Sequence, residues 1–179
     1  MQFPAKSINR CLVVLVAVLS FGCTQQVDVI KTRYRPAEQP QPADRTAQSS
    51  ADSLFQRTLD EGLRLLQQDS LMEAGLCFDR ALAIDSSQWM PYYYLAGIDA
   101  EKENYSKARA HLFSSLEKAP VDKQVRSLIY SALAESWESE GNLGRAHLDF
   151  LTALNLDPNS KRASEGLDRI EQTRTQSGR

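Results

Sequence analysis

Histidine and cysteine are scarce in this sequence, and the common catalytic motifs are absent. The 179 residues include two histidines and three cysteines. A zinc site, or a nucleophile with its base, needs several such groups that converge. Neither His111 nor His147 has a cluster of Cys, His or carboxylate residues at ligand spacing, and no Gly-rich phosphate loop, GxSxG or HExxH motif occurs. The sequence therefore predicts a protein that is not an enzyme and that has no cofactor or metal site.

Positive charge is also in short supply. The formal net charge is −2, and acidic side chains outnumber basic ones by about seven over residues 51–171. A surface that binds nucleic acid needs a basic patch. We therefore predict no nucleic-acid partner.

The sequence has no apolar run long enough to span a bilayer. Its one long run, from Cys11 to Phe21, has 11 residues, whereas a membrane-spanning helix needs about 20. Two basic residues precede the run, and Gly22 follows it. A basic start, a short apolar centre and a small residue at the end are typical of a secretory signal peptide, which we place at residues 1–22.

The end of this segment, Gly22-Cys23, resembles the cleavage box of bacterial lipoproteins. The resemblance implies that the peptidase cuts before Cys23, that its thiol carries diacylglycerol and that the new amino group is acylated. Three acyl chains would anchor the protein firmly to a membrane. By the same resemblance, Thr24 favours the periplasmic face of the outer membrane. Ser20 stands where the family prefers leucine, and an ordinary signal peptide cleaved nearby is the alternative.

Residues 23–50 are rich in Gln, Pro, Arg and Ala and lack apolar periodicity after Ile30. This composition predicts a disordered linker that holds the remaining chain away from the membrane. Once Cys11 and Cys23 are assigned to the signal peptide and the anchor, Cys77 stands alone, so no internal disulfide is predicted.

A pattern of alanines repeats three times between residues 74 and 154. In each run an Ala is followed by a large apolar residue, a small residue and Leu, and the runs begin 34 and 38 residues apart. Self-similarity at this period predicts stacked helix hairpins, because small residues let two helices approach and each hairpin leaves an apolar face for the next. One extra helical turn in the third unit would account for the longer interval. The runs are Ala74-Phe78-Ala81-Leu82, Ala108-Leu112-Ser115-Leu116 and Ala146-Phe150-Ala153-Leu154.

The third unit resembles the tetratricopeptide repeat (TPR) in the order Tyr130, Leu133-Ala134, Trp137, Gly141-Asn142, Ala146, Phe150, Ala153 and Pro158. The second unit matches well, and the first less so, with Glu61 where the family prefers an aliphatic residue. The resemblance implies an all-α TPR solenoid of three helix-turn-helix repeats plus a C-terminal capping helix. We place the domain at residues 51–172, with repeats at about 55–88, 89–122 and 127–160, the capping helix at about 160–172 and a disordered tail at 173–179.

The capping helix carries an apolar stripe of Ala163, Leu167 and Ile170 at helical spacing. Its charged residues, including Arg162 and Arg169, are expected to face away from the stack.

In TPR stacks the first helix of each repeat lines a concave groove, and the resemblance implies a partner-binding groove here. It would run from apolar residues in the first repeat to acidic ones in the third, and would suit a peptide or helix with an apolar stripe and a basic end. Burial of the first-repeat leucines by a longer helix, by residues 27–30 or by a second copy of the chain is the alternative. The predicted groove residues are Leu59, Leu63, Leu66, Met90, Tyr93, Leu128, Glu135 and Glu138.

Together these features predict a non-enzymatic scaffold anchored to the bacterial envelope. It would bind a protein partner in its groove during assembly of a pilus, secretion or outer-membrane complex. A self-associating module is the alternative, in which the apolar first repeat forms a homodimer.

Overall fold

The computed structural model describes residues 42–177. The predicted signal peptide, the Cys23 anchor and most of the predicted linker lie outside the described residues. Seven helices are described, and all of them belong to one compact unit, Pro40–Arg179.

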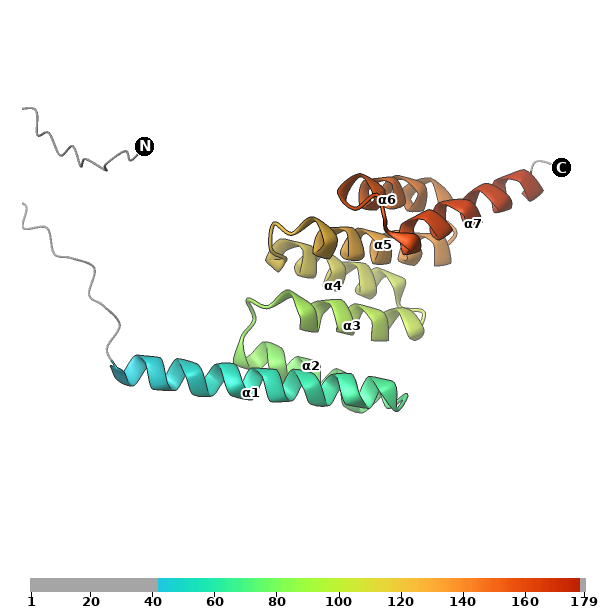
Figure 1. Cartoon of the computed structure of the whole chain (residues 1–179). Coiled ribbons are helices and arrows are strands. Elements are labelled where there is room, and N and C mark those ends of the chain that lie inside the picture. The colour runs from blue at the N-terminus through green and yellow to red at the C-terminus, as the bar shows by residue number, and fades with distance from the viewer. Residues whose placement is uncertain (1–41, 178–179) are drawn as a thin grey trace, which may run out of the picture. The chain divides into compact units, whose positions relative to one another are not determined.

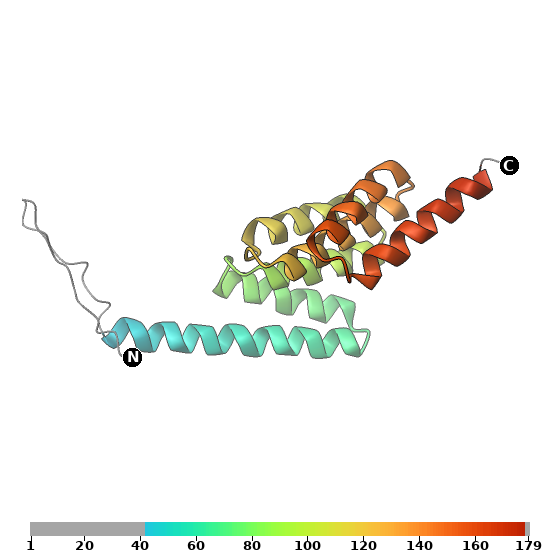
Figure 2. The same ribbon diagram turned by 45° about the horizontal axis from the view of Figure 1, so that its top comes forward.

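The helices pair into three hairpins that stack in chain order, followed by a single last helix (Figures 1 and 2). Each hairpin packs against the first helix of the next one. This is the predicted all-α solenoid of three helix-turn-helix repeats with a capping helix. The helices are α1 (Pro42–Gln67), α2 (Leu71–Ile84), α3 (Trp89–Glu101), α4 (Tyr105–Lys118), α5 (Lys123–Ser139), α6 (Leu143–Leu156) and α7 (Lys161–Ser177).

Close helix contacts at the repeated small residues form the core. Ala74, Ala81, Ala146 and Ala153 are fully buried, as the repeat pattern predicts. A Cβ added at Gly62 would lie 2.7 Å from the ring of Phe78, so only glycine lets α1 and α2 approach this closely. The three apolar clusters of the core draw all their buried members from residues 55–170.

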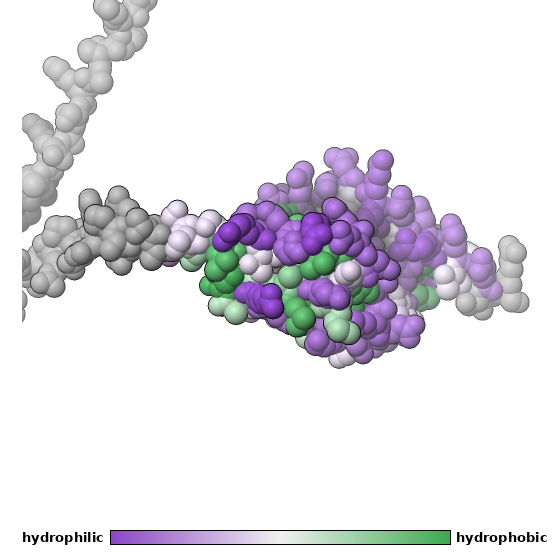
Figure 3. Space-filling view, turned by 90° about the horizontal axis from the view of Figure 1, so that it is seen from below, coloured by the Kyte–Doolittle hydropathy of each residue, from purple (hydrophilic) through white to green (hydrophobic). Residues whose placement is uncertain are grey.

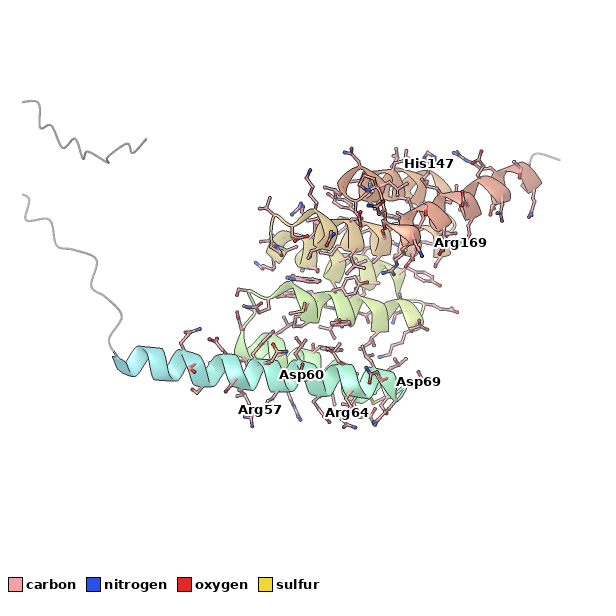
Figure 4. The ribbon with its side chains drawn as sticks, in the orientation of Figure 1. Arg57, Asp60, Arg64, Asp69, His147 and Arg169 are labelled. Carbon is pink, nitrogen blue, oxygen red and sulfur yellow. The ribbon has the colours of Figure 1, made fainter. Side chains whose placement is uncertain are left out.

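The outer face of the first repeat, at the start of the stack, carries charged residues. Pro91, Leu95 and Ile98 are buried on α3, which packs on α2. The residues 34 positions earlier on α1 are Arg57, Glu61 and Arg64, and all three are exposed. Arg57 and Arg64 point away from the stack (Figure 4), and Arg64 pairs with Glu61 at 2.5 Å. A terminal repeat needs such a polar outer face, which explains why this unit departs from the family pattern at Glu61.

The third repeat has the longer first helix that its 38-residue interval predicts. Helix α5 has 17 residues and α3 has 13. The helix begins at Lys123, because the Asp122 side chain accepts hydrogen bonds from the backbone N–H groups of Gln124 and Val125, at 2.8 and 3.1 Å.

Both ends of the described region are more helical than predicted. Helix α1 begins at Pro42, so the predicted linker is wrong for residues 42–50. This segment is rich in good helix formers, and Pro42 occupies the first helical position, where proline is favoured. Helix α7 runs to Ser177, so the predicted tail is wrong for residues 173–177. No glycine or proline interrupts the sequence between Leu167 and Ser177.

No helix within residues 42–177 is both long enough and apolar enough to cross a bilayer.

Gly166 tests the contact that attaches the cap. A Cβ at this position would collide with three atoms of the buried Phe150 ring. We expect Gly166→Ala to lower the free energy of unfolding by about 1–3 kcal/mol, the usual penalty for overpacking. Gly144→Ala is the matched control, because Gly144 is an exposed helical glycine with room for a Cβ. Urea unfolding of the fragment 42–179 measures both, and equal stability of the two variants would contradict the contact.

Candidate protein-binding groove

The inner face of the stack contains a hollow of about 750 Å³. Its walls come from α1, the start of α2, α3, α4, α5 and α7 and from the turns that end α1 and α3. Aromatic and small residues form much of its lining, and charged residues stand at its edges. Its lining includes Leu66, Asp69, Tyr93, Gly97, Ala100, Glu101, Glu103, Glu135, Ser139 and Arg162.

Three of the eight predicted groove residues, Leu66, Tyr93 and Glu135, line this hollow. Leu59 does not, and its assignment to the groove is wrong. Its side chain is only 2% exposed and lies in the core cluster of the first repeat with Phe55. Leu59 is buried because this side of α1 packs on α2, and its core cluster also includes Leu95 and Ile98 of α3. The side chain therefore faces the core rather than the groove.

The other four predicted residues lie outside the lining of the hollow. Leu63 and Met90 are partly buried against the core of the first repeat. Leu128 is exposed at 37% near the start of α5. Glu138 lies on the same helix and pairs with Arg169 of α7.

The capping helix neutralises the predicted acidic end of the groove. Arg162 Nε donates to Glu135 Oε1 at 2.6 Å, and a second guanidinium nitrogen donates to Glu135 Oε2. A third bond, 2.7 Å long, joins Arg162 to the Tyr93 hydroxyl. The hydrogen bonds to Glu135 raise the pKa of Arg162 above its usual value. Helix α7 is thereby tied to both α5 and α3.

Two predictions are therefore corrected. Arg169 donates to Glu138 at 2.8 and 3.0 Å, so Arg162 and Arg169 face α5 instead of pointing away from the stack. The groove consequently does not run from an apolar end to an acidic end along the stack, because both carboxylates of the third repeat carry a guanidinium partner.

The carboxylates without such partners lie at a different edge of the hollow. Asp69 and Glu103 belong to the turns after α1 and α3, and Glu101 is the last residue of α3. None of the three makes a side-chain hydrogen bond or ion pair within the described residues. We call this edge the turn rim. Asp69 and Glu103 have φ values of 59° and 58°, and the equivalent third-repeat residue is Gly141 at 84°. Two repeats thus keep a carboxylate in a left-handed conformation that favours glycine.

Gly97 lies on α3 between Tyr93 and Glu101, and it is exposed in the hollow. A Cβ at this position would meet no atom within 4 Å. Packing therefore does not require glycine here, although a glycine inside a helix destabilises it by about 0.5–1 kcal/mol relative to alanine.

Two buried charged clusters lie outside the hollow's lining, and sequence analysis did not predict them. Asp99 is 5% exposed and lies 3.1 Å from Lys107 Nζ and 3.3 Å from His111 Nε2. Burial lowers the pKa of His111. The sequence does carry a signal, since the equivalent residues of the other repeats, Leu65 and Trp137, are apolar.

The second cluster surrounds Trp137. The Arg109 guanidinium lies 3.7 Å from the centre of the Trp137 ring and pairs with Glu140 at 2.8 Å. It also donates to the Ser136 hydroxyl at 3.3 Å. Because the charged groups of both clusters pair with each other, we interpret the clusters as structural. Residues 42–177 contain no group of three or more His, Cys, Asp or Glu side chains that could hold a metal ion.

Comparison with known proteins identifies the fold. No protein-family model and no curated protein matches the chain. The second TPR domain of human RPAP3, solved in complex with an HSP70 peptide, matches with a TM-score of 0.60 and 20% identity over 68% of this chain and 98% of that one. The TPR domain of Arabidopsis OM64 matches with a TM-score of 0.62 and 17% identity over 69% and 98%.

A bacterial structure matches as well. The type III secretion chaperone SycD of Yersinia enterocolitica, solved with a peptide of the translocator YopD, has a TM-score of 0.58 and 16% identity over 70% of this chain and 95% of that one. At these identities the likeness concerns the fold alone. The chain has the TPR fold that its repeats predict.

A double-mutant cycle tests the tie between α7 and α5. The Arg162 and Glu135 side chains are 39% and 32% exposed, so their interaction is partly screened by solvent. We expect Arg162→Met and Glu135→Gln to show a coupling free energy of about 1 kcal/mol, and a smaller value at high salt. Urea unfolding of the fragment 42–179 provides the measurement. Strictly additive effects of the two substitutions would show that the pair does not stabilise the cap.

Proposed function

We propose that this protein is a non-enzymatic adaptor that binds a segment of a protein partner in the hollow on its inner face. The observation that carries the proposal is Gly97. A helical glycine that destabilises α3, with open space above it, provides a place where the backbone of a bound segment can approach closely. Tyr93 and Leu66 offer apolar contact on either side of this place.

The similar structures support this proposal. The RPAP3 domain and SycD were each solved with a peptide. Their modes of capture are not carried over residue by residue, because the identities are low. The support comes from the shared fold and from the hollow of about 750 Å³ in this chain, which is large enough for a peptide.

The place of action in this proposal is the bacterial envelope, at the periplasmic face of the outer membrane. Support comes from the sequence before the described residues, where a short apolar run ends at Gly22-Cys23. A lipid on Cys23 and the chain that follows it would hold the repeats near the membrane surface. The adaptor would then bring its partner into a larger envelope complex.

The first repeat gives little support to the alternative of a homodimer through its apolar residues. Leu59 is part of the core, and Leu63 and Leu66 pack against that core. Viewed from this end of the stack, the surface shows hydrophobic groups separated by hydrophilic ones rather than one continuous patch (Figure 3).

Filling the hollow tests the proposal directly. We expect Gly97→Trp to abolish partner capture, because the indole would occupy the space above α3 without entering the core. Gly144→Trp is the matched control, since Gly144 is also an exposed helical glycine but does not line the hollow. Both tagged full-length variants would be used for affinity capture from detergent-solubilised envelopes. The same partners on both variants would rule out the hollow as the binding site.

Membrane attachment has a separate test. We expect Cys23→Ser to leave the precursor uncleaved and to release the protein from the lipid-anchored membrane fraction. Metabolic labelling with a fatty acid, together with fractionation of the envelope, measures both effects. Normal processing and labelling of the variant would exclude Cys23 as the anchor, and would leave the groove proposal untouched.

A further inference from the structure

The hollow has an uneven distribution of charge. Four carboxylates line it, those of Asp69, Glu101, Glu103 and Glu135, and the one lining cation is Arg162. Arg162 is already bound to Glu135. The uncompensated charge therefore lies at the turn rim, while Gly97, Ala100 and Leu66 supply a less polar surface next to it. A segment that fits this surface has apolar residues next to cations.

The chain itself contains such a segment, and it lies outside the described residues. Residues 27–35 read VDVIKTRYR. In an extended chain alternate residues share one side, so Val27 and Val29 would share a side with the three cations. These cations are Lys31, Arg33 and Arg35. One side of this segment is thus apolar in its first half and basic in its second half, which matches the apolar surface of the hollow and the turn rim beside it.

The end of the segment is too close in sequence to α1 for all of its cations to reach their own turn rim. Helix α1 begins at Pro42, and Leu66 lies 24 residues along it, which is about 36 Å at 1.5 Å per residue. The turns that carry the rim lie at the far end of α1 from Pro42 (Figure 1). The seven residues from Arg35 to Pro42 span at most about 25 Å, so Arg35 stops short of the rim of its own molecule even with its side chain extended. All three cations can therefore pair with the turn rim only in a second copy.

The long first helix also leads away from the hollow. Helix α1 has 26 residues, and its first part extends beyond the hairpins that stack on it (Figures 1 and 2). No large apolar residue occurs from Pro42 to Ser53, so this part has little with which to pack on its own repeats.

We propose that the hollow of one copy binds residues 27–35 of a second copy. Val27 and Val29 lie over the surface around Gly97, and the cations pair with the turn rim. This inference rests on the proposed role of the hollow as a peptide-binding groove. It adds regulation to that role, because a partner protein must compete with the segment of a neighbouring copy.

Photo-crosslinking in the full-length protein tests the proposal. A benzophenone amino acid at Ser139, an exposed lining residue, would be introduced into one of two differently tagged copies made in the same cells. We expect irradiation of membranes to join the two copies, with the adduct mapped by mass spectrometry to residues 27–35. The same probe at Gly144, outside the hollow, should not give this adduct.

Charge exchange makes the test specific. The triple substitution Lys31→Glu, Arg33→Glu and Arg35→Glu should abolish the adduct, and adding Glu101→Lys and Glu103→Lys should restore it. Adducts formed only within one chain, adducts formed only with a different protein, or an adduct that the charge reversal leaves unchanged would each overturn the proposal. Envelope processing of the variants is checked in parallel, because the substitutions lie shortly after Cys23.

A titration separates this inference from the proposed function. The fragment 42–179, which holds all three core clusters, would be titrated into a fluorescent peptide of residues 24–36. We expect binding that weakens about tenfold or more when the three cations are replaced by Glu, which is what two partly exposed ion pairs would contribute. If this peptide does not bind while Gly97→Trp still abolishes partner capture, the inference fails and the proposed function stands. If Gly97→Trp changes neither partner capture nor binding of the peptide, both the inference and the proposed function fail.

Discussion

Each hairpin of this protein leaves one apolar face that only the next helix can cover, and the whole structure follows from this constraint. Helix α3 covers the first hairpin with Pro91, Leu95 and Ile98, and α7 covers the last with Ala163 and Ile170. On α1, the first helix of the described stack, the same positions are charged. The described stack ends at α1 and α7 because the outer face of α1 is charged and the outer face of α7 is polar, so neither offers an apolar surface to a further repeat.

The cap has a second consequence, since it also sets the chemistry of the hollow. The packing of Gly166 on Phe150 holds α7 close to α6, and this places Arg162 over Glu135 and Tyr93. The guanidinium removes one negative charge from the inner face and leaves the turn rim as the acidic part. A helix whose first role is to cover an apolar surface thus determines where a cationic segment can bind.

Repetition explains how much of the fold could be predicted from the sequence. Ala74, Ala108 and Ala146 recur at intervals of 34 and 38 residues, so their burial, the hairpins and the longer α5 follow from spacing. The groove is different, because its residues do not repeat. Position in the repeat suggested that Leu59 lines the groove, but α1 has neighbours on two sides and turns this residue into the core. The pairing of Arg162 with Tyr93 joins residues 69 positions apart in sequence, and no local pattern could indicate it.

Three glycines distinguish positions where packing requires glycine from a position where it does not. Gly62 and Gly166 are each explained by a phenylalanine ring that leaves no room for a Cβ, so their presence serves packing. Gly97 has the same intrinsic penalty for a helix and no such ring beside it. Since alanine would fit and would stabilise α3, the described structure alone gives no reason for glycine at this position. In the proposed function the reason is a bound segment that lies close to Gly97 in the hollow, and this would place the specificity of the protein on α3 and the turn rim rather than along the repeated alanines.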